Sequence, residues 1–357
     1  VGIMVLCLAL AANMLEMLHT KDDLLPGAVL YFRIYALGMP ALGIFNFGNA
    51  VLSANGDTKR PLLYLTIAGI LNVILNLFFV IVCKMAADGV ALASVISQYV
   101  SAILVVWHMM RLNDACKFYF QRLRFHGDEV GRILGLGVPA GIQHMIFAIA
   151  NLFIQAAVNS FDSTMVSGNA AAANTDTIIY NIMMAFYTAC STFMGQNWGA
   201  GHKKRMMDSY LISLFYAFAV AAVLGVAFYF AGRPFLYVFT NSADVVEAGM
   251  QRMKIMCFSY AISAFMDNTI AASRGLGKSL VPTIIVISGS CVFRIIWIYT
   301  VFAYFHTLPS LYLLYVFSWA ITAIAEIAYF THIWKKTSST LVDIDVPNGV
   351  TICAENS

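Results

Sequence analysis

The sequence Ala54-Asn55-Gly56-Asp57-Thr58-Lys59-Arg60-Pro61 has a counterpart later in the chain, Gly275-Leu276-Gly277-Lys278-Ser279-Leu280-Val281-Pro282. Each stretch is a short basic turn between long apolar runs, and in each a Gly is followed five residues later by a Pro. The offset between the stretches is 221 positions (277 − 56), and the same offset relates further identical pairs: Pro61 and Pro282, Ser97 and Ser318. We interpret this constant register as an internal repeat.

The repeat extends well beyond the turn, because residues 1–112 and 222–333 show the same order of apolar runs and polar breaks. In this register Asn46 falls opposite Asp267. Paired halves in a membrane protein are typical of transporters, with a binding site between the halves and alternating access by rocking. The repeat therefore predicts a two-lobe transporter.

The same register predicts that the first lobe is incomplete. The second unit begins near Gly131, and the offset places the matching start about ninety residues before Val1. The sequence also begins without Met, inside an apolar run that lacks the basic start of a signal peptide. We therefore expect an N-terminally truncated sequence that lacks about two helices and part of a third.

Composition predicts an all-α polytopic membrane protein. The chain is 61% apolar and 11% charged, whereas soluble domains are about one quarter charged. A membrane-spanning helix needs about 20 mostly apolar residues, and the apolar runs here are continuous rather than alternating, which excludes a β-barrel. About ten spans are expected, at 1–18, 28–54, 62–83, 89–110, 132–160, 164–193, 209–231, 247–273, 281–304 and 310–334.

The distribution of Lys and Arg predicts how the chain is oriented in the membrane. If the spans alternate, fourteen basic residues fall on one side of the membrane: Lys59, Arg60, Arg111, Lys117, Arg122, Arg124, Arg132, Lys203, Lys204, Arg205, Arg274, Lys278, Lys335 and Lys336. The other side has Lys21, Lys84 and Arg233, with Arg252 and Lys254 near a helix mouth. Because cytoplasmic loops are enriched in Lys and Arg, we expect the C-terminus in the cytoplasm. We expect the protein to lie in the plasma membrane.

The longest polar stretch between spans, 111–131, divides the chain. We expect an N-terminal lobe at 1–110, a cytoplasmic linker at 111–131, a C-terminal lobe at 132–334 and a cytoplasmic tail at 335–357. Basic residues scattered over short loops argue against nucleic-acid binding. The seven Cys form no CxxC pair, so neither a disulfide framework nor a metal site is expected.

Ionisable residues inside apolar spans are energetically costly and usually face a cavity or a partner. Asp176 and Asp267 are the candidates for binding a coupling cation or proton, and the alternative is a structural pair, for example with Arg294. A functional role is less well supported for Glu326, for which an interhelical hydrogen bond is the alternative. His144 is interpreted as a core histidine.

Asn72 and Asn76 are one helical turn apart and so share a face of their span. Their amide oxygens, with Ser94 on the next span as a third ligand, could replace part of the water shell of a cation. They could equally bond to each other or to a neighbouring helix. Spacing alone does not choose between these alternatives.

Aromatic residues and Met are abundant, with 26 Phe, 17 Tyr, 5 Trp and 18 Met. Such side chains suit flat, lipophilic cations through stacking and cation–π contacts, although most of them pack or face lipid. The candidates for lining a substrate cavity are Gln143, Asn174, Asn181, Met184 and Tyr187. Signatures of catalysis, including a phosphate loop, are absent, so we expect no enzyme and no cofactor, and uphill transport would need an ion gradient.

Three further stretches carry a family resemblance: Gly135-Leu136-Gly137-Val138-Pro139-Ala140-Gly141-Ile142-Gln143, Val158-Asn159-Ser160-Phe161, and Met194-Gly195-Gln196-Asn197-Trp198-Gly199-Ala200-Gly201 followed by Arg205. With the two Gly-to-Pro turns, they resemble the multidrug and toxic-compound extrusion (MATE) family over nearly the whole chain. The resemblance implies twelve helices in two six-helix lobes, of which this sequence supplies helices three to six and seven to twelve.

The resemblance also implies a function, namely export of organic cations or amphipathic drugs by antiport with Na⁺ or H⁺. In one branch of the family a first-lobe cation site uses an Asn, an Asp and a hydroxyl, and the matching positions here are Asn72, Asn76 and Ser94, with Asn76 in place of the carboxylate. Other branches place acidic residues in the second lobe, which favours Asp176 and Asp267. The expected partners are a small cationic or amphipathic substrate and membrane lipid, with the protein a monomer.

Two alternatives remain open at this point. A flippase for lipid-linked sugars of the same superfamily also has two lobes, but usually has a more basic cavity than Arg294 and Arg33 would provide here. A truncated membrane protein without transport activity is the other alternative. The sequence does not indicate the drug, the coupling ion or the oligomeric state.

Overall fold

The computed structural model describes residues 1–17, 24–113 and 116–338, so part of the predicted linker and tail lies outside the described residues. Nine helices in these ranges are long and apolar enough to span a membrane. The helix at the N-terminus, α1 (Gly2–Met17), is apolar but shorter. The prediction of an all-helical polytopic membrane protein is therefore confirmed.

The chain divides into two compact units, residues 1–124 and 125–357. The division falls inside the stretch that we predicted as a linker. Helices of the first unit after α1 are α2 (Leu25–Ala36), α3 (Met39–Ala54), α4 (Lys59–Leu77), the π-helical η1 (Phe78–Val82), α5 (Ala87–Arg111) and the 3₁₀ turn η2 (Phe120–Arg122).

The span expected at 28–54 is one of these nine, Leu25–Ala54, and it is interrupted between α2, which ends at Ala36, and α3, which begins at Met39. Pro40 lies in the first turn of α3, where its missing N–H removes no hydrogen bond. At Gly38 a Cβ would come within 2.1 Å of Oε1 of Gln98 on α5. The absence of a side chain at Gly38 therefore lets the chain pass close to α5 without a clash.

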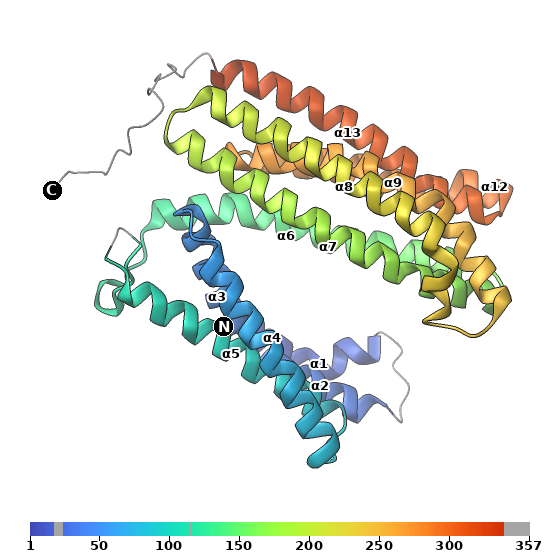
Figure 1. Cartoon of the computed structure of the whole chain (residues 1–357), viewed down its shortest axis with the longest axis horizontal. Coiled ribbons are helices and arrows are strands. Elements are labelled where there is room, and N and C mark those ends of the chain that lie inside the picture. Colours follow the sequence, from blue (N-terminus) through green and yellow to red (C-terminus); the bar gives the residue numbers. More distant parts are fainter. Residues whose placement is uncertain (18–23, 114–115, 339–357) are drawn as a thin grey trace. The chain divides into compact units, whose positions relative to one another are not determined.

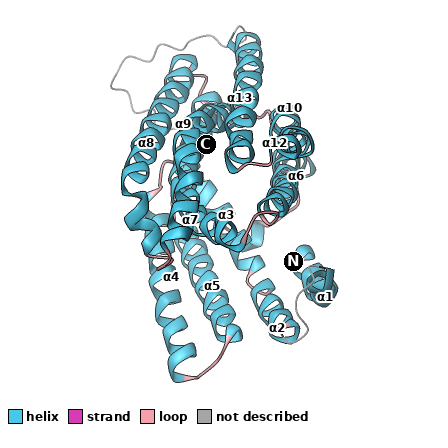
Figure 2. Cartoon of the chain, turned by 90° about the vertical axis from the view of Figure 1, so that its right-hand side faces the viewer, coloured by secondary structure: helices cyan, strands magenta, loops and turns pink. Residues whose placement is uncertain are grey.

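Helices of the second unit are α6 (Gly127–Val158), α7 (Ser163–Gly199), α8 (Lys203–Tyr237), α9 (Ala243–Gly275), α10 (Leu280–Val286), the π-helical η3 (Ile287–Val292), α11 (Phe293–Trp297), the π-helical η4 (Ile298–Phe302), α12 (Ala303–Phe305) and α13 (Leu308–Ser338). Figure 1 shows α7, α8 and α13 running alongside α9. Figure 2 shows α6, α10 and α12 gathered on one side of this unit and α7, α8 and α9 on the other.

The core of the second unit lies around α9, which is its most buried long helix. Small residues let the neighbouring helices approach it closely, as is common between membrane helices. A Cβ at Gly225 on α8 would come within 2.2 Å of the carbonyl oxygen of Cys257 on α9, and a Cβ at Gly168 on α7 within 2.7 Å of the Gly249 nitrogen. These contacts fix α7 and α8 against α9 and so set the positions of their polar side chains.

The two turns that define the repeat have the same local structure. Gly56 and Gly277 both have positive φ, of 86° and 74°, a conformation that Gly adopts with little strain. The Gly56 N–H donates to the Ser53 carbonyl, and the Gly277 N–H donates to the Arg274 carbonyl, 221 positions later. Each turn thus ends a long helix with the hydrogen bonds of a Gly-terminated C-cap.

The helix boundaries follow the same offset. α3 ends at Ala54 and α9 ends at Gly275, and α5 begins at Ala87 while α13 begins at Leu308. The intervening helix of each unit contains a π-helical segment before its end, η1 in the first unit and η4 in the second. The offset of 221 positions therefore relates the secondary structure of the two units as well as their sequences.

Candidate functional site

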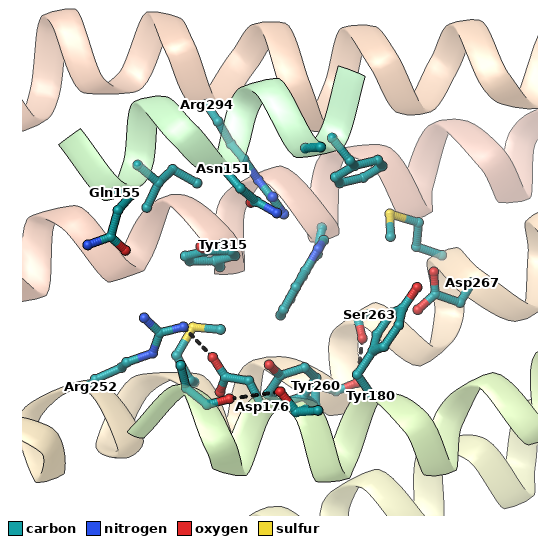
Figure 3. A pocket seen from close by; sticks show the side chains of 18 of the residues that line it. Asn151, Gln155, Asp176, Tyr180, Arg252, Tyr260, Ser263, Asp267, Arg294 and Tyr315 are labelled. Carbon is teal, nitrogen blue, oxygen red and sulfur yellow. Dashed lines mark hydrogen bonds and ion pairs between the residues drawn. The ribbon is translucent and has the colours of Figure 1, made fainter. Parts of the chain in front are cut away.

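A cavity of about 570 Å³ lies within the second unit. Five helices line it: α6, α7, α9, α11 and α13. Its polar side chains face one another from two sides. Figure 3 shows Arg294 and Asn151 entering from one side, and Asp176, Tyr180 and Tyr260 from the other. The walls between them are aromatic and thioether side chains, among them Phe147, Met256, Met266, Tyr315 and Trp319.

One face of α7 contributes to the cavity because its residues recur at helical spacing. Ala173, Asp176, Thr177 and Tyr180 all line it, at the i, i+3, i+4 and i+7 positions that share a helix face. The helix begins with Asp162 as its N-cap, whose carboxylate accepts from the Met165 N–H at 2.9 Å.

Asp176 is neutralised by Arg252 on α9. The two form a part-buried salt bridge, in which the Asp176 side chain is 18% exposed and the Arg252 side chain 9%. A second N–H group of Arg252 donates to the Asn169 amide oxygen, which also accepts from the Tyr312 hydroxyl at 2.9 Å. Asp176 does have a structural partner, but the partner is Arg252 rather than the Arg294 that we considered from the sequence.

Asp267 lines the cavity from α9 and is half-buried. Within the described ranges no salt bridge includes Asp267. Arg294 and Arg274 are both close enough to interact with it electrostatically. Asp267 is therefore an acidic group of the cavity wall with two arginines nearby, and its role as a cation site stays a prediction.

Gln143 lines the same cavity and also binds Arg274. Its amide oxygen accepts from Nη2 of Arg274 at 2.9 Å, and Nη1 of the same arginine donates to the Tyr187 hydroxyl at 2.6 Å. His144 also lines the cavity. Arg274, which we assigned to the basic loops, thus connects α9 to α6 and α7 next to the cavity.

The remaining cavity candidates on α7 lie outside its lining. Asn174 is exposed and donates to the carbonyl oxygens of Ala170 and Ala171 on its own helix. Asn181 is exposed and Met184 is half-buried. Tyr187 contacts Arg274 instead. Asn174, Asn181, Met184 and Tyr187 therefore do not line the cavity of the second unit, and their role in binding a substrate stays a prediction.

In the first unit, Asn72, Asn76 and Ser94 are brought together. The Asn76 amide donates to the Asn72 oxygen at 3.0 Å, and the Asn72 amide donates to the Ser94 hydroxyl oxygen at 3.5 Å. The Ser94 hydroxyl in turn donates to the Val90 carbonyl. These contacts fit the packing alternative, since the side chains satisfy one another, although the Asn76 amide oxygen is buried without a hydrogen-bond partner. A cation site at these residues stays a prediction.

Sequence reasoning missed most of the cavity wall, including Asn151, Gln155, Tyr180, Tyr260, Tyr315 and Trp319. It also missed the role of Arg252. A charged residue ten positions into a membrane helix is a signal for a buried partner, and Arg252 is such a residue in α9. The described residues contain no group of three or more His, Cys, Asp or Glu side chains placed to hold a metal ion.

Comparison with known proteins relates the chain to membrane transporters. It is 29% identical over 279 residues to a probable multidrug resistance protein, YpnP, of Bacillus subtilis, an alignment that covers 77% of this chain and 62% of the relative. It is 25% identical over 241 residues to an FAD transporter of Shewanella oneidensis, covering 65% of this chain and 52% of the relative. The chain thus spans about half to two thirds of the length of these relatives.

Solved structures show the same fold. A multidrug resistance MATE family transporter of the MOP superfamily, in an outward-facing conformation, superposes with a TM-score of 0.88 at 18% sequence identity, over 95% of this chain and 76% of that chain. A MATE crystal structure in a bent conformation gives 0.86 at the same identity and coverage. The MatE family model matches residues 1–78 and 139–300. The chain belongs to the MatE family.

Proposed function

We propose that this chain acts in a secondary active exporter of flat, amphipathic small molecules, and that the cavity of the second unit binds them. Family membership and the relatives described as multidrug resistance proteins support this proposal. The cavity has the volume and the largely aromatic and apolar walls of a small-molecule site, with a few polar groups to orient a ligand.

The observation that carries the proposal is the difference between the two cavity acids. Asp176 is neutralised by Arg252, whereas Asp267 has no salt-bridge partner among the described residues and faces the cavity. An unpaired carboxylate inside a membrane helix marks an ion or substrate pathway. We infer that Asp267 binds the coupling ion, H⁺ or Na⁺, or the cationic group of a substrate.

Competition for Asp267 would couple the flux of the ion to the flux of the substrate. A proton or Na⁺ at the carboxylate removes the negative charge that attracts a substrate cation, so each ligand would release the other. This reciprocal exclusion is negative cooperativity, a positive and therefore unfavourable coupling free energy between two ligands. With the rocking of two lobes that the repeat predicts, it would give antiport.

A substrate with negative charge is the second candidate class. One relative is described as an FAD transporter, and a flavin nucleotide has both a flat ring system and phosphate groups. The cavity contains two arginines, Arg252 and Arg294, which makes flavin nucleotides a second candidate class. A flippase for lipid-linked sugars is not proposed, because the relatives named above are drug and FAD transporters.

The test is transport by the purified full-length protein in proteoliposomes. Ethidium flux is measured under an imposed pH gradient, an imposed Na⁺ gradient and no gradient, for the wild type and for Asp267→Asn. We expect flux in one gradient only and its loss in Asp267→Asn. The control is Asp244→Asn, which changes an exposed acid in the first turn of the same helix. Gradient-driven flux that is equal in Asp267→Asn and the wild type would refute the role of Asp267, and no gradient-driven flux at all would refute the proposal.

A further inference from the structure

Arg294 is a buried cavity arginine without an acidic partner in the described part of the chain. It is 2% exposed. Its Nε donates to the Ser318 hydroxyl oxygen at 3.2 Å, and its Nη2 is buried with no hydrogen-bond partner. Arg252, the other cavity arginine, has Asp176 and Asn169 as partners. A buried charge that is neither paired nor fully hydrogen-bonded is destabilising, so Arg294 has donor capacity that its own fold leaves unused.

Three aromatic rings surround the guanidinium. Its central carbon lies 4.5 Å from the ring centroid of Tyr315, 5.5 Å from that of Phe147 and 5.7 Å from that of Trp319. Rings at these distances attract the cation through their faces, but they supply no in-plane acceptor for its N–H groups. The rings therefore hold the guanidinium at the cavity while leaving part of its hydrogen-bonding edge available.

The backbone holds Arg294 in place. The residue lies in α11, between the two π-helical segments η3 and η4, and such segments occur frequently at functional sites. In η3 the Ser290 hydroxyl pairs with the Thr322 hydroxyl on α13 at 3.0 Å. At Gly289 a Cβ would come within 2.5 Å of that same hydroxyl oxygen. The close contact of η3 with α13 fixes the direction from which Arg294 enters the cavity.

The charges of the cavity then reduce to two groups. Asp176 and Arg252 neutralise each other. Arg294 and Asp267 remain, and they interact electrostatically without forming a salt bridge among the described residues. Figure 3 shows the Arg294 side chain reaching into the cavity, with Asp267 lining another part of the wall. The cavity thus offers one donor group for an anion and one acceptor group for a cation, with aromatic side chains between them.

We propose that Arg294 binds an anionic group, a carboxylate or phosphate, carried by a flat aromatic substrate. This inference rests on the proposed function, because it concerns the substrate of the same cavity. A guanidinium presents planar N–H donors that match the geometry of a carboxylate or phosphate. The residue therefore makes the cavity select acids over their neutral esters, and it makes zwitterionic aromatic compounds the best fitting class.

A matched pair of dyes tests the selection. One is a rhodamine with a free carboxylate and the other is its methyl ester, so that the flat cationic ring system is common to both. Binding to the purified chain in lipid nanodiscs is measured by fluorescence polarisation. We expect the wild type to bind the acid more tightly than the ester. In Arg294→Gln the affinity for the acid should fall about tenfold to a hundredfold, as for loss of a hydrogen bond between charged groups, with the affinity for the ester changed less than about twofold.

Two variants serve as controls. Arg294→Lys keeps the charge without the planar fork and should retain part of the preference for the acid. Arg233→Gln removes an exposed arginine of the same unit that pairs with Glu247 at 2.6 Å, and it should leave both affinities unchanged. Equal losses for acid and ester in Arg294→Gln, or no loss, would overturn the inference.

The lipid composition of the nanodisc shows whether Arg294 binds a substrate or a lipid headgroup. If anionic phospholipid headgroups occupy Arg294, phosphatidylglycerol should abolish the preference of the wild type for the acid, which would overturn the assignment to a substrate. We expect the preference to persist in discs of phosphatidylcholine with or without phosphatidylglycerol. A lost preference in Arg294→Gln without gradient-driven transport in the wild type would refute the proposed function alone. Saturable binding of neither dye would refute both.

Discussion

Arg252 on α9 and Asp176 on α7 form a part-buried salt bridge at the edge of the cavity, and Asn169 and Tyr312 extend it into a network that joins α7, α9 and α13. The pair divides the charged groups of the cavity into a structural pair and two groups, Asp267 and Arg294, that have no salt-bridge partner among the described residues. Its two residues lie on α7 and α9, which have the most extensive contact in this unit. The pair therefore also helps to hold α7 against α9.

Breaking this pair from one side should destabilise the second unit strongly. Asp176→Asn leaves a buried guanidinium, at a cost of about 3–5 kcal/mol. Arg252→Gln leaves a partly exposed carboxylate, which should cost less. The double variant removes both charges and should lose less than the sum of the two single variants, because the singles share one interaction. Thermal unfolding of the purified variants in detergent measures this. If the loss of stability in the double variant equals the sum of the losses in the two single variants, the two residues act independently.

The two repeat turns should respond alike to the same substitution. Gly56→Ala and Gly277→Ala each place a Cβ on a backbone with positive φ, which costs about 1–2 kcal/mol per residue. Gly56→Asn and Gly277→Asn should be milder, since Asn tolerates this conformation. No atom lies within 4 Å of a Cβ at either position, so backbone strain alone decides the result. Midpoints of thermal unfolding test it, and unequal Ala penalties at the two turns would contradict the equivalence.

The sequence predicted the helices and the repeat because both depend on local patterns. Long apolar runs locate the spans, and Gly56 and Gly277 mark turns whose φ values the structure then shows. Asp176 and Asp267 were also found, because an acid inside an apolar run is conspicuous. Their different states were not predictable, since the partner of Asp176 lies 76 residues away on another helix. That pairing depends on how α7 and α9 pack.

The sequence did not show which face of α7 lines the cavity of the second unit. Asn174 and Asn181 are seven residues apart and so share a face, but the cavity is lined by Asp176 and Tyr180 from a neighbouring face. The helix contains many Ala and Thr residues and shows no clear apolar stripe, so its periodicity does not indicate which side is buried. Close contacts such as that of Gly168 with α9 decide the orientation.

The orientation of the chain in the membrane can be tested with cysteine labelling. Cys83 is exposed at the end of the apolar span that precedes α5, on the side that the charge distribution places outside. Phe125, in the predicted cytoplasmic linker, is 98% exposed. A membrane-impermeant maleimide should label Cys83 in intact cells. It should label Phe125→Cys, in a background in which Cys83, Cys116 and Cys353 are changed to Ser, only after permeabilisation. The reverse pattern would invert the predicted topology.

Glu326 on α13 provides the last test, because the structure shows a buried carboxylic acid whose two oxygens have no hydrogen-bond partner. The interhelical hydrogen bond that we considered for it from the sequence is therefore not present among the described residues. Replacing an unsatisfied buried polar group by an apolar one of similar size is often neutral or stabilising. Glu326→Met should therefore unfold at the same or a higher temperature than the wild type.

Transport by the same variant then separates a structural from a functional role for Glu326. Arg274 is close enough to interact with this carboxylate electrostatically, and Arg274 also contacts Gln143 at the cavity. If Glu326 takes no part in ion coupling, Glu326→Met should keep the gradient-driven ethidium flux of the wild type. A stable variant without flux would instead add Glu326 to the coupling groups, since a carboxylate that does not stabilise the fold would then be required for transport.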